Sequence, residues 1–180
     1  MIGNDIVDLE LAAVQSNWQR KGWLQKIFTE SEQNRIWKAE NPNQMVWKLW
    51  SMKEAVYKAH QRRFSLSPKY NPRDFICADT LVGIDTYWYQ TVSKQTKKYV
   101  YTIAYTDDTN FISKVFTDKS LEYKKTLQYY IADILDVNLS AVSIKKDDNG
   151  IPGVKIHNKF TDIPLSLSSH GSFSAFTINL

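Results

Sequence analysis

One segment of the chain carries acidic and basic side chains at a spacing that could do chemistry. Residues 50–59 read WSMKEAVYKA, with Glu54 and Lys58 four residues apart and Lys53 directly before the glutamate. On a helix, Glu54 and Lys58 share one face, and Lys53 lies about 100° round from Glu54. A carboxylate and an ammonium then point the same way, although this spacing alone is more often an ordinary exposed pair.

Two further candidates lie near the ends of the chain. Asp5 belongs to the alternating segment Ile2–Leu9, which predicts a short strand with the acid at or near its end. Taken alone, such an acid is more often a turn residue. His170 is preceded by Ser168 and Ser169, and a lone histidine is more often structural. Residue types alone therefore identify no site.

The elements that must position these residues follow from periodicity and capping. Apolar residues predict a helix over about 44–62, and Thr29 with Glu32 predicts a capping box that begins an earlier helix. Further strands are predicted at 76–84, 86–93, 99–105, 111–116, 153–156, 165–167 and 173–180. We expect the strands between 76 and 116 to form an antiparallel meander, and an amphipathic helix over 120–135 to pack on it. The fold class is therefore α+β.

Composition narrows the class of protein. Hydrophobic residues make up 43% and charged residues 23%, as in ordinary globular domains. The N-terminus predicts no secretion signal, and no apolar run reaches the roughly 20 residues that cross a bilayer. The single cysteine, Cys77, cannot form an internal disulfide. We expect a cytoplasmic protein with no membrane partner, and its net charge of +4 favours anionic ligands.

Four ordered segments resemble motifs of the 4'-phosphopantetheinyl transferase superfamily. They are 3–9 (GNDIVDL, similar to G-I-D-I and an acid), 28–32 (F-T-x-x-E), 50–59 (W-x-x-K-E-A-x-x-K-A), and the pair 150–152 with 165–170 (G-x-P and S-x-S-H). Their order and approximate spacing also match, whereas residues 70–120 are similar only in being strand-like. The family's fold is an antiparallel sheet packed with helices.

The resemblance implies transfer of 4'-phosphopantetheine from coenzyme A to a serine of an acyl or peptidyl carrier protein, releasing 3',5'-ADP. It implies Mg²⁺ held by Asp5 and Glu54, because this hard cation needs few carboxylates besides water and phosphate oxygens. Lys53 and Lys58 would complete a positive cradle for the phosphates. Glu54, or water on the metal, would accept the serine proton, and Lys58 would stabilise the leaving phosphate.

By the same resemblance, His170 contacts a coenzyme phosphate, and Ser168 or Ser169 supplies further donors. The chain departs from the family pattern at two positions. Gly171 follows the histidine directly, where the family commonly has a serine, threonine or acid. Val7 stands where two-domain members carry an additional acidic metal ligand, and water could fill that place.

We expect one compact unit with a metal- and phosphate-binding half over 1–117 and a second half over 118–180. Two arrangements fit this division. One is a permuted protein of two similar halves with a complete site in one chain. The other, which the motif order slightly favours, is a short trimeric form with an inserted strand region and sites shared between subunits. A monomer with full activity would exclude the second.

Two other functions are compatible with the residues. Aromatic residues reach 13%, and aromatics beside basic side chains can bind single-stranded nucleic acid, but most of these aromatics fall at core positions. Two acids and a lysine could also position water in a metal-dependent phosphodiester hydrolase. The four motifs favour the transferase, with carriers of fatty-acid or secondary-metabolite synthesis as partners and no nucleic acid.

Overall fold

The structure is a computed structural model that describes residues 1–106, 110–117 and 122–179. Its helices are α1 (Leu9–Gln15), α2 (Trp23–Ile27), α3 (Glu30–Lys38), α4 (Pro42–Phe64) and α5 (Glu122–Ile134), with 3₁₀ turns η1 (Pro72–Asp74) and η2 (Leu139–Ala141). Its strands are β1 (Ile2–Asp8), β2 (Ile76–Ala78), β3 (Leu81–Ile84), β4 (Tyr87–Gln95), β5 (Tyr99–Tyr105), β6 (Phe111–Phe116), β7 (Val142–Lys146), β8 (Pro152–Ile156), β9 (Lys159–Phe160), β10 (Leu165–His170) and β11 (Phe173–Asn179).

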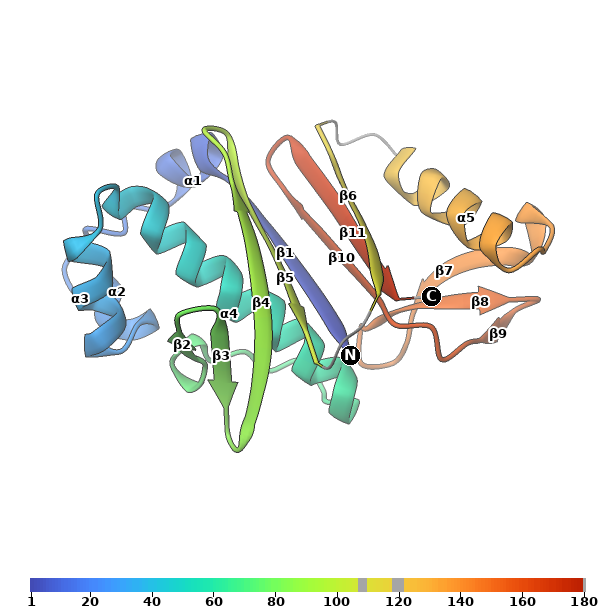
Figure 1. The fold of residues 1–180 in the computed structure, drawn as a ribbon, viewed down its shortest axis with the longest axis horizontal. Helices are drawn as coiled ribbons and strands as arrows, with labels where there is room; N and C mark the ends of the chain where they lie inside the picture. The colour runs from blue at the N-terminus through green and yellow to red at the C-terminus, as the bar shows by residue number, and fades with distance from the viewer. Residues whose placement is uncertain (107–109, 118–121, 180) are drawn as a thin grey trace.

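The first sheet has the order β1-β5-β4-β3-β2, and all neighbouring strands are antiparallel. Helix α4 crosses one face of this sheet, as Figure 1 shows. The predicted meander is confirmed for β2 to β5, except that residues 76–84, predicted as one strand, form the hairpin of β2 and β3. Strand β1 adds to the outer edge of β5, so that Asp5 lies opposite Thr102 in the middle of the strand. The expectation that Asp5 ends its strand is therefore wrong.

The last third of the chain forms two smaller sheets, β10-β11-β6 and β7-β8-β9. The expectation that residues 111–116 extend the meander is wrong, because β1 already occupies the edge of β5 and β6 pairs with β11 instead. Residues 111–116, which precede the expected division after residue 117, therefore belong to a sheet of the second half. Residues 118–121, where the division and the start of the predicted helix at 120 fall, lie outside the described residues.

Helix α5 packs on the second half rather than on the meander. Its buried residues Leu127 and Ile131 share a cluster with Val154, Leu165 and Phe176. The predicted amphipathic helix is confirmed, but the apolar surface that it covers belongs to β7, β8, β10 and β11. Periodicity gives the apolar face of a helix and does not say which sheet will meet it.

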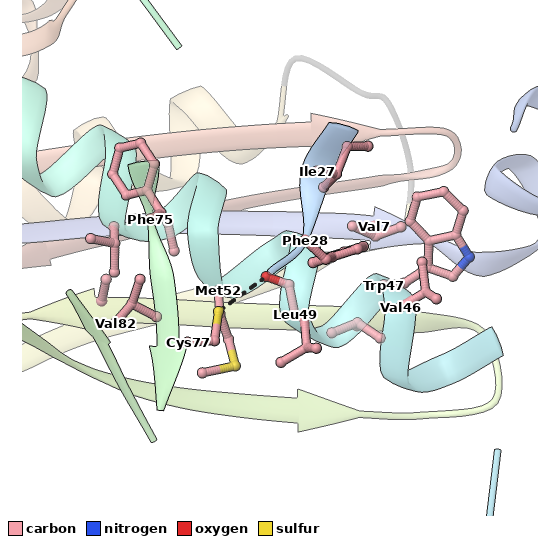
Figure 2. Close-up of a cluster of buried hydrophobic side chains, with 14 of the residues drawn as sticks. Val7, Ile27, Phe28, Val46, Trp47, Leu49, Met52, Phe75, Cys77 and Val82 are labelled. Carbon is pink, nitrogen blue, oxygen red and sulfur yellow. Dashed lines mark hydrogen bonds between the residues drawn. The ribbon is translucent and has the colours of Figure 1, made fainter. Parts of the chain in front are cut away.

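The main core lies between α4 and the first sheet. Figure 2 shows Phe28, Leu49 and Met52 packed among the side chains of β1, β2 and β3, with the Cys77 thiol donating to the carbonyl of Leu49 at 3.8 Å. The buried residues of α4 recur at helical spacing, as the sequence predicts, and the helix extends two residues beyond the prediction at each end. This packing holds the helix of residues 50–59 against β1.

Strand β1 approaches α4 very closely at Gly3. A Cβ atom at this position would lie 2.1 Å from the carbonyl oxygen of Ala55 and 2.6 Å from the amide nitrogen of Ala59. Only a residue without a side chain lets the two backbones approach to this distance. The glycine that opens the first motif therefore sets the separation between the strand of Asp5 and the helix of Glu54.

Candidate active site

Asp5 and Glu54 line the same pocket, which has a volume of about 420 Å³. Asp5 comes from the middle of β1 and Glu54 from α4, which lies across that strand. Apolar walls are supplied by Trp23, Trp47 and Trp50. Two acids that are 49 positions apart in the sequence therefore meet at one surface, because the strand and the helix are packed face to face.

Lys58 lies beside Asp5 and is half-buried. Its ammonium group donates to Asp5 Oδ1 at 3.1 Å and to the carbonyl oxygen of Asn4 at 2.9 Å. The second carboxylate oxygen, Asp5 Oδ2, is buried and has no hydrogen-bond partner among the residues that the structure describes. A buried carboxylate oxygen without a donor is costly, and a cation is its natural partner.

The environment of Glu54 favours its protonated form. Burial and the negative charge of Asp5 raise the pKa of its carboxyl, Lys58 acts in the opposite direction, and the result is a pKa of about 7. A carboxyl that titrates near neutral pH can accept a proton without holding it too tightly. The same repulsion between two acids shows that this site is electrostatically suited to a positive ion.

A second pocket, also of about 420 Å³, opens on the other side of Lys58. Its cationic side chains come from both halves of the chain: Lys58 and Arg62 from α4, Lys124 from α5 and Lys146 from β7. No acidic side chain is present among the described residues that line it. The arrangement can neutralise a polyanion such as a nucleotide with several phosphate groups.

The two pockets meet at the end of β10. Ser169 lines both of them, Ser168 lines the basic one, and His170 lines the acidic one. The hydroxyl oxygen of Ser168 is buried and has no partner within the described parts of the chain. The structure thus brings the serines and histidine of the C-terminal motif to the acids and lysine of the first half, within a single chain.

His170 is held by the first half of the molecule. Its Nδ1 accepts a hydrogen bond from the backbone N–H of Asp8 at 2.9 Å, and its Nε2 lies 3.3 Å from Gln15 Oε1. This geometry fixes the ring at the pocket edge. Asp8, which the sequence analysis treated only as part of a motif, is therefore a structural link between the halves.

Gly171, the departure from the family pattern, is explained by the same contact. The residue has φ +56, and a Cβ atom would lie 2.1 Å from Asp8 Oδ2. That oxygen accepts the backbone N–H of Ser172 at 2.9 Å. Burial would raise the pKa of Asp8, but hydrogen bonds from the backbone N–H groups of Ser172, Leu11 and Glu10 lower it overall. A serine at position 171 would displace this carboxylate.

Lys53 lies elsewhere, and its expected place in the phosphate cradle needs correction. The side chain is fully buried, and its ammonium donates to Glu32 Oε2 at 2.8 Å and to the carbonyl oxygens of Ile27, Pro72 and Phe75. Helical geometry had placed it about 100° from Glu54, and that rotation carries it into the core. We assign Lys53 to the structure of the fold and not to ligand binding.

Arg62, like Lys124 and Lys146, lines the basic pocket without having been predicted as a nucleotide-binding residue. The sequence shows it only as part of a basic pair with Arg63, which is typical of a solvated surface. Its signal was its position four residues after Lys58, on the same face of the helix.

A larger hollow of about 750 Å³ adjoins the acidic pocket, with which it shares Ser16 and Trp47. Its lining is rich in amide side chains, including those of Asn17, Asn43 and Gln44. The described residues that line this hollow include no carboxylate, whereas the neighbouring pocket has Asp5, with Lys58 bound to it, and Glu54. We therefore place the candidate chemistry at the smaller pocket.

The residues fit a divalent cation of the magnesium type. Within the described ranges, no group of three or more His, Cys, Asp or Glu side chains is arranged around a common point. Two carboxylates with space for water and phosphate oxygens form the donor set that Mg²⁺ usually accepts. The unpartnered Asp5 Oδ2 beside Glu54 is the observation that supports this fit.

Comparison with known proteins agrees with the geometry. The sequence model of the 4'-phosphopantetheinyl transferase superfamily matches residues 1–104, which is more than half of the chain. The chain belongs to this superfamily, and its general activity is phosphopantetheinyl transfer. Among solved structures, it is similar to the Thermotoga maritima holo-[acyl-carrier-protein] synthase at 11% identity and a TM-score of 0.42, over 87% of this chain and 82% of that one. No curated protein matches. Among the described residues, no helix is long and apolar enough to cross a membrane.

Proposed function

We propose that this protein transfers 4'-phosphopantetheine from coenzyme A to a serine of an acyl or peptidyl carrier protein and releases 3',5'-ADP. The observation that carries the proposal is the meeting of Asp5, Glu54 and Lys58 beside a basic pocket. Family membership supports the general reaction. The two adjoining pockets support separate places for coenzyme A, the donor of the group, and for the carrier serine, its acceptor.

Asp5 and Glu54 are the residues that would hold Mg²⁺. When bound, the ion would neutralise charge on the pyrophosphate and orient it for in-line attack. Lys58 binds Asp5 Oδ1, and the unpartnered Oδ2 would be available to hold the ion. The protein therefore contributes a fixed pair of acids and one ammonium, and substrate and water complete the set.

Glu54 is also our candidate for the proton acceptor. In the reaction, the carrier serine oxygen forms a bond to the phosphorus next to the pantetheine, and the bond from that phosphorus to the leaving 3',5'-ADP breaks. The serine proton passes to Glu54, directly or through one water molecule. The pKa of this carboxyl is raised to about 7 without the ion, and bound Mg²⁺ would lower it, so that Glu54 would be ionised and able to accept the proton at neutral pH.

The basic pocket is where we place the nucleotide. Lys58 lines the basic pocket and binds Asp5, which lines the acidic one, and it would stabilise the negative charge that develops on the leaving phosphate. Ser168 and Ser169 would supply hydroxyl or backbone donors to the nucleotide phosphates. His170 lines the neighbouring acidic pocket. The pantetheine and the carrier serine would then approach from the side of the three tryptophans.

One chain contributes every residue in this proposal, and this favours the arrangement with a complete site per chain over shared sites. The order of motifs had favoured the second arrangement. The contact between Asp8 and His170, which joins the two ends of one chain at the pocket, is the reason for the change. We therefore propose that a monomer is active.

The test is a mass-shift assay with coenzyme A, Mg²⁺ and a panel of apo carrier proteins. We expect one carrier to gain the mass of one phosphopantetheine, and Asp5→Asn or Glu54→Gln to abolish the gain. Val14→Ala, on the exposed surface of α1, is the control and should retain full transfer. Full transfer by both acid variants would refute the metal site, and salt-sensitive nucleic-acid binding without transfer would favour the binding module.

A further inference from the structure

Strand β10 carries Ser168, Ser169 and His170, and it must be held in place for these residues to face the first half. At its C-terminal end, the Asp8 backbone N–H holds His170. At its second residue, Ser166 Oγ accepts the backbone N–H of Asn4 at 2.9 Å. Figure 1 shows β10 running beside β1 without joining its sheet. Besides its pairing with β11 and the apolar cluster that packs β11 on β1 and β5, these side-chain hydrogen bonds set the position of β10 relative to the first half.

The contact at the N-terminal end of β10 is made by Arg62. The guanidinium Nη2 donates to the carbonyl oxygens of Leu165, the first residue of β10, and of Pro152, the first residue of β8. These two strands begin 13 residues apart, and one side chain of α4 joins both to the helix of Glu54 and Lys58. The side chain also lines the basic pocket.

The neighbouring turn is fastened to the same end of α4. Gln61 Nε2 donates to the carbonyl oxygen of Asn149 at 3.1 Å, and Asn149 Nδ2 donates to the carbonyl oxygen of Ser65 at 2.9 Å. The turn is rigid in itself, because Asp147 Oδ1 accepts the backbone N–H groups of Asn149 and Ile151. Several hydrogen bonds thus hold the G-x-P segment to α4, and Arg62 also donates to β10.

From these contacts we propose that Arg62 is a positioning residue for the transfer reaction, holding β8 and β10 against α4 so that the β10 serines stay aligned with Lys58 and Glu54. This inference rests on the proposed function. A planar guanidinium suits the task, since its donors have fixed directions and it stays protonated when buried. Burial lowers the pKa of Arg62 to about 10, and the charge of Asp147 opposes the shift, so the group is a cation at neutral pH.

The decisive variant is Arg62→Met, which keeps most of the stem and removes the donors. We expect the KM for coenzyme A to rise roughly tenfold to a hundredfold, with kcat changed less than the KM. In the free protein, we expect amide hydrogen exchange to become faster over residues 147–156 and 165–170. Arg63→Met is the matched control, because Arg63 is exposed, lies over the rings of Phe64 and Tyr87, and lines neither pocket.

Arg62→Lys provides a second measurement if the methionine variant does not fold. It keeps the charge but not the planar set of donors, so we expect intermediate changes in both KM and exchange. A raised KM with unchanged exchange would show direct phosphate binding and overturn the positioning role. Faster exchange with an unchanged KM would show a purely structural role and overturn it as well. Absence of transfer by the wild type would instead refute the proposed function, while the exchange measurement would still test the contact.

Discussion

Two lysines of α4, five residues apart, have different environments. Lys53 is fully buried, and its ammonium is surrounded by Glu32 and three backbone carbonyl oxygens. The side chain of Lys58 is 28% exposed, binds Asp5, and lines the basic pocket. Five residues are about 500° of helical rotation, so the two side chains leave the helix on different sides. Lys53 therefore stabilises the fold that carries the site, whereas Lys58 lies in the site itself.

Glu32 is the centre of the buried region. Its Oε2 accepts the backbone N–H of Thr29 at 2.8 Å in the predicted capping box, and its Oε1 accepts the backbone N–H of Cys77 at 2.7 Å. Together with Lys53, it ties α3, α4 and β2 to one another. The F-T-x-x-E motif and the first lysine of the helix motif are therefore one structural unit.

The largest effect on stability should follow from breaking that unit. Lys53→Met leaves Glu32 as a buried charge without its partner, and we expect the free energy of unfolding to fall by about 3–5 kcal/mol. Denaturant unfolding measures it. A change below about 1 kcal/mol would contradict the structural assignment of Lys53, and the exposed Lys38→Met serves as a control.

The pH dependence of stability should report the environment of Glu54. In the metal-free protein, the pKa of Glu54 is raised from 4.5 to about 7 by burial and by Asp5. Between these values the folded state binds more protons than the unfolded state, so Glu54's contribution to stability decreases as pH rises through that window. The decrease amounts to about 3 kcal/mol.

Glu54→Gln should remove this decrease. We therefore expect the metal-free variant to gain stability relative to the wild type on going from pH 4.5 to pH 8, as urea unfolding at several pH values would measure. Mg²⁺ should stabilise the wild type at pH 8 and have a much smaller effect on the variant. A pH-independent difference between the two proteins would contradict the environment described for Glu54.

The smallest effect on stability, with a large effect on activity, should come from Lys58. Its ion pair with Asp5 is partly exposed on the lysine side, but the variant leaves the buried Asp5 without a donor, and we expect Lys58→Met to lower the free energy of unfolding by about 1–2 kcal/mol. Loss of the cation next to the leaving phosphate should lower kcat about a hundredfold. Thermal unfolding and the carrier mass-shift assay on the same preparation measure both. If Lys58→Met lost as much stability as Lys53→Met, the difference described between the two lysines would be wrong.

Local signals in the sequence determined the secondary structure that matters most for the site. The helix of residues 50–59, the capping box at Thr29 and strands β5 and β6 follow from patterns contained within a few residues. Helices α1 and α2 and strand β7 were not predicted, because they are short and carry weak periodicity. The resemblance to a family supplied Asp5, Glu54, Lys58, Ser169 and His170, which the fold places around one pair of pockets.

Only the tertiary structure decided what surrounds each of these side chains. Nothing near Lys53 in the sequence shows that Glu32 and three carbonyl groups enclose it, and Arg62 appears no different from Arg63 until β8 and β10 are in place. Strand β6 had a strand-like sequence but no signal for its partner, since pairing depends on which sheet edge is free. Periodicity and capping act over one or two helical turns, whereas burial and charge environment depend on segments more than 100 residues apart.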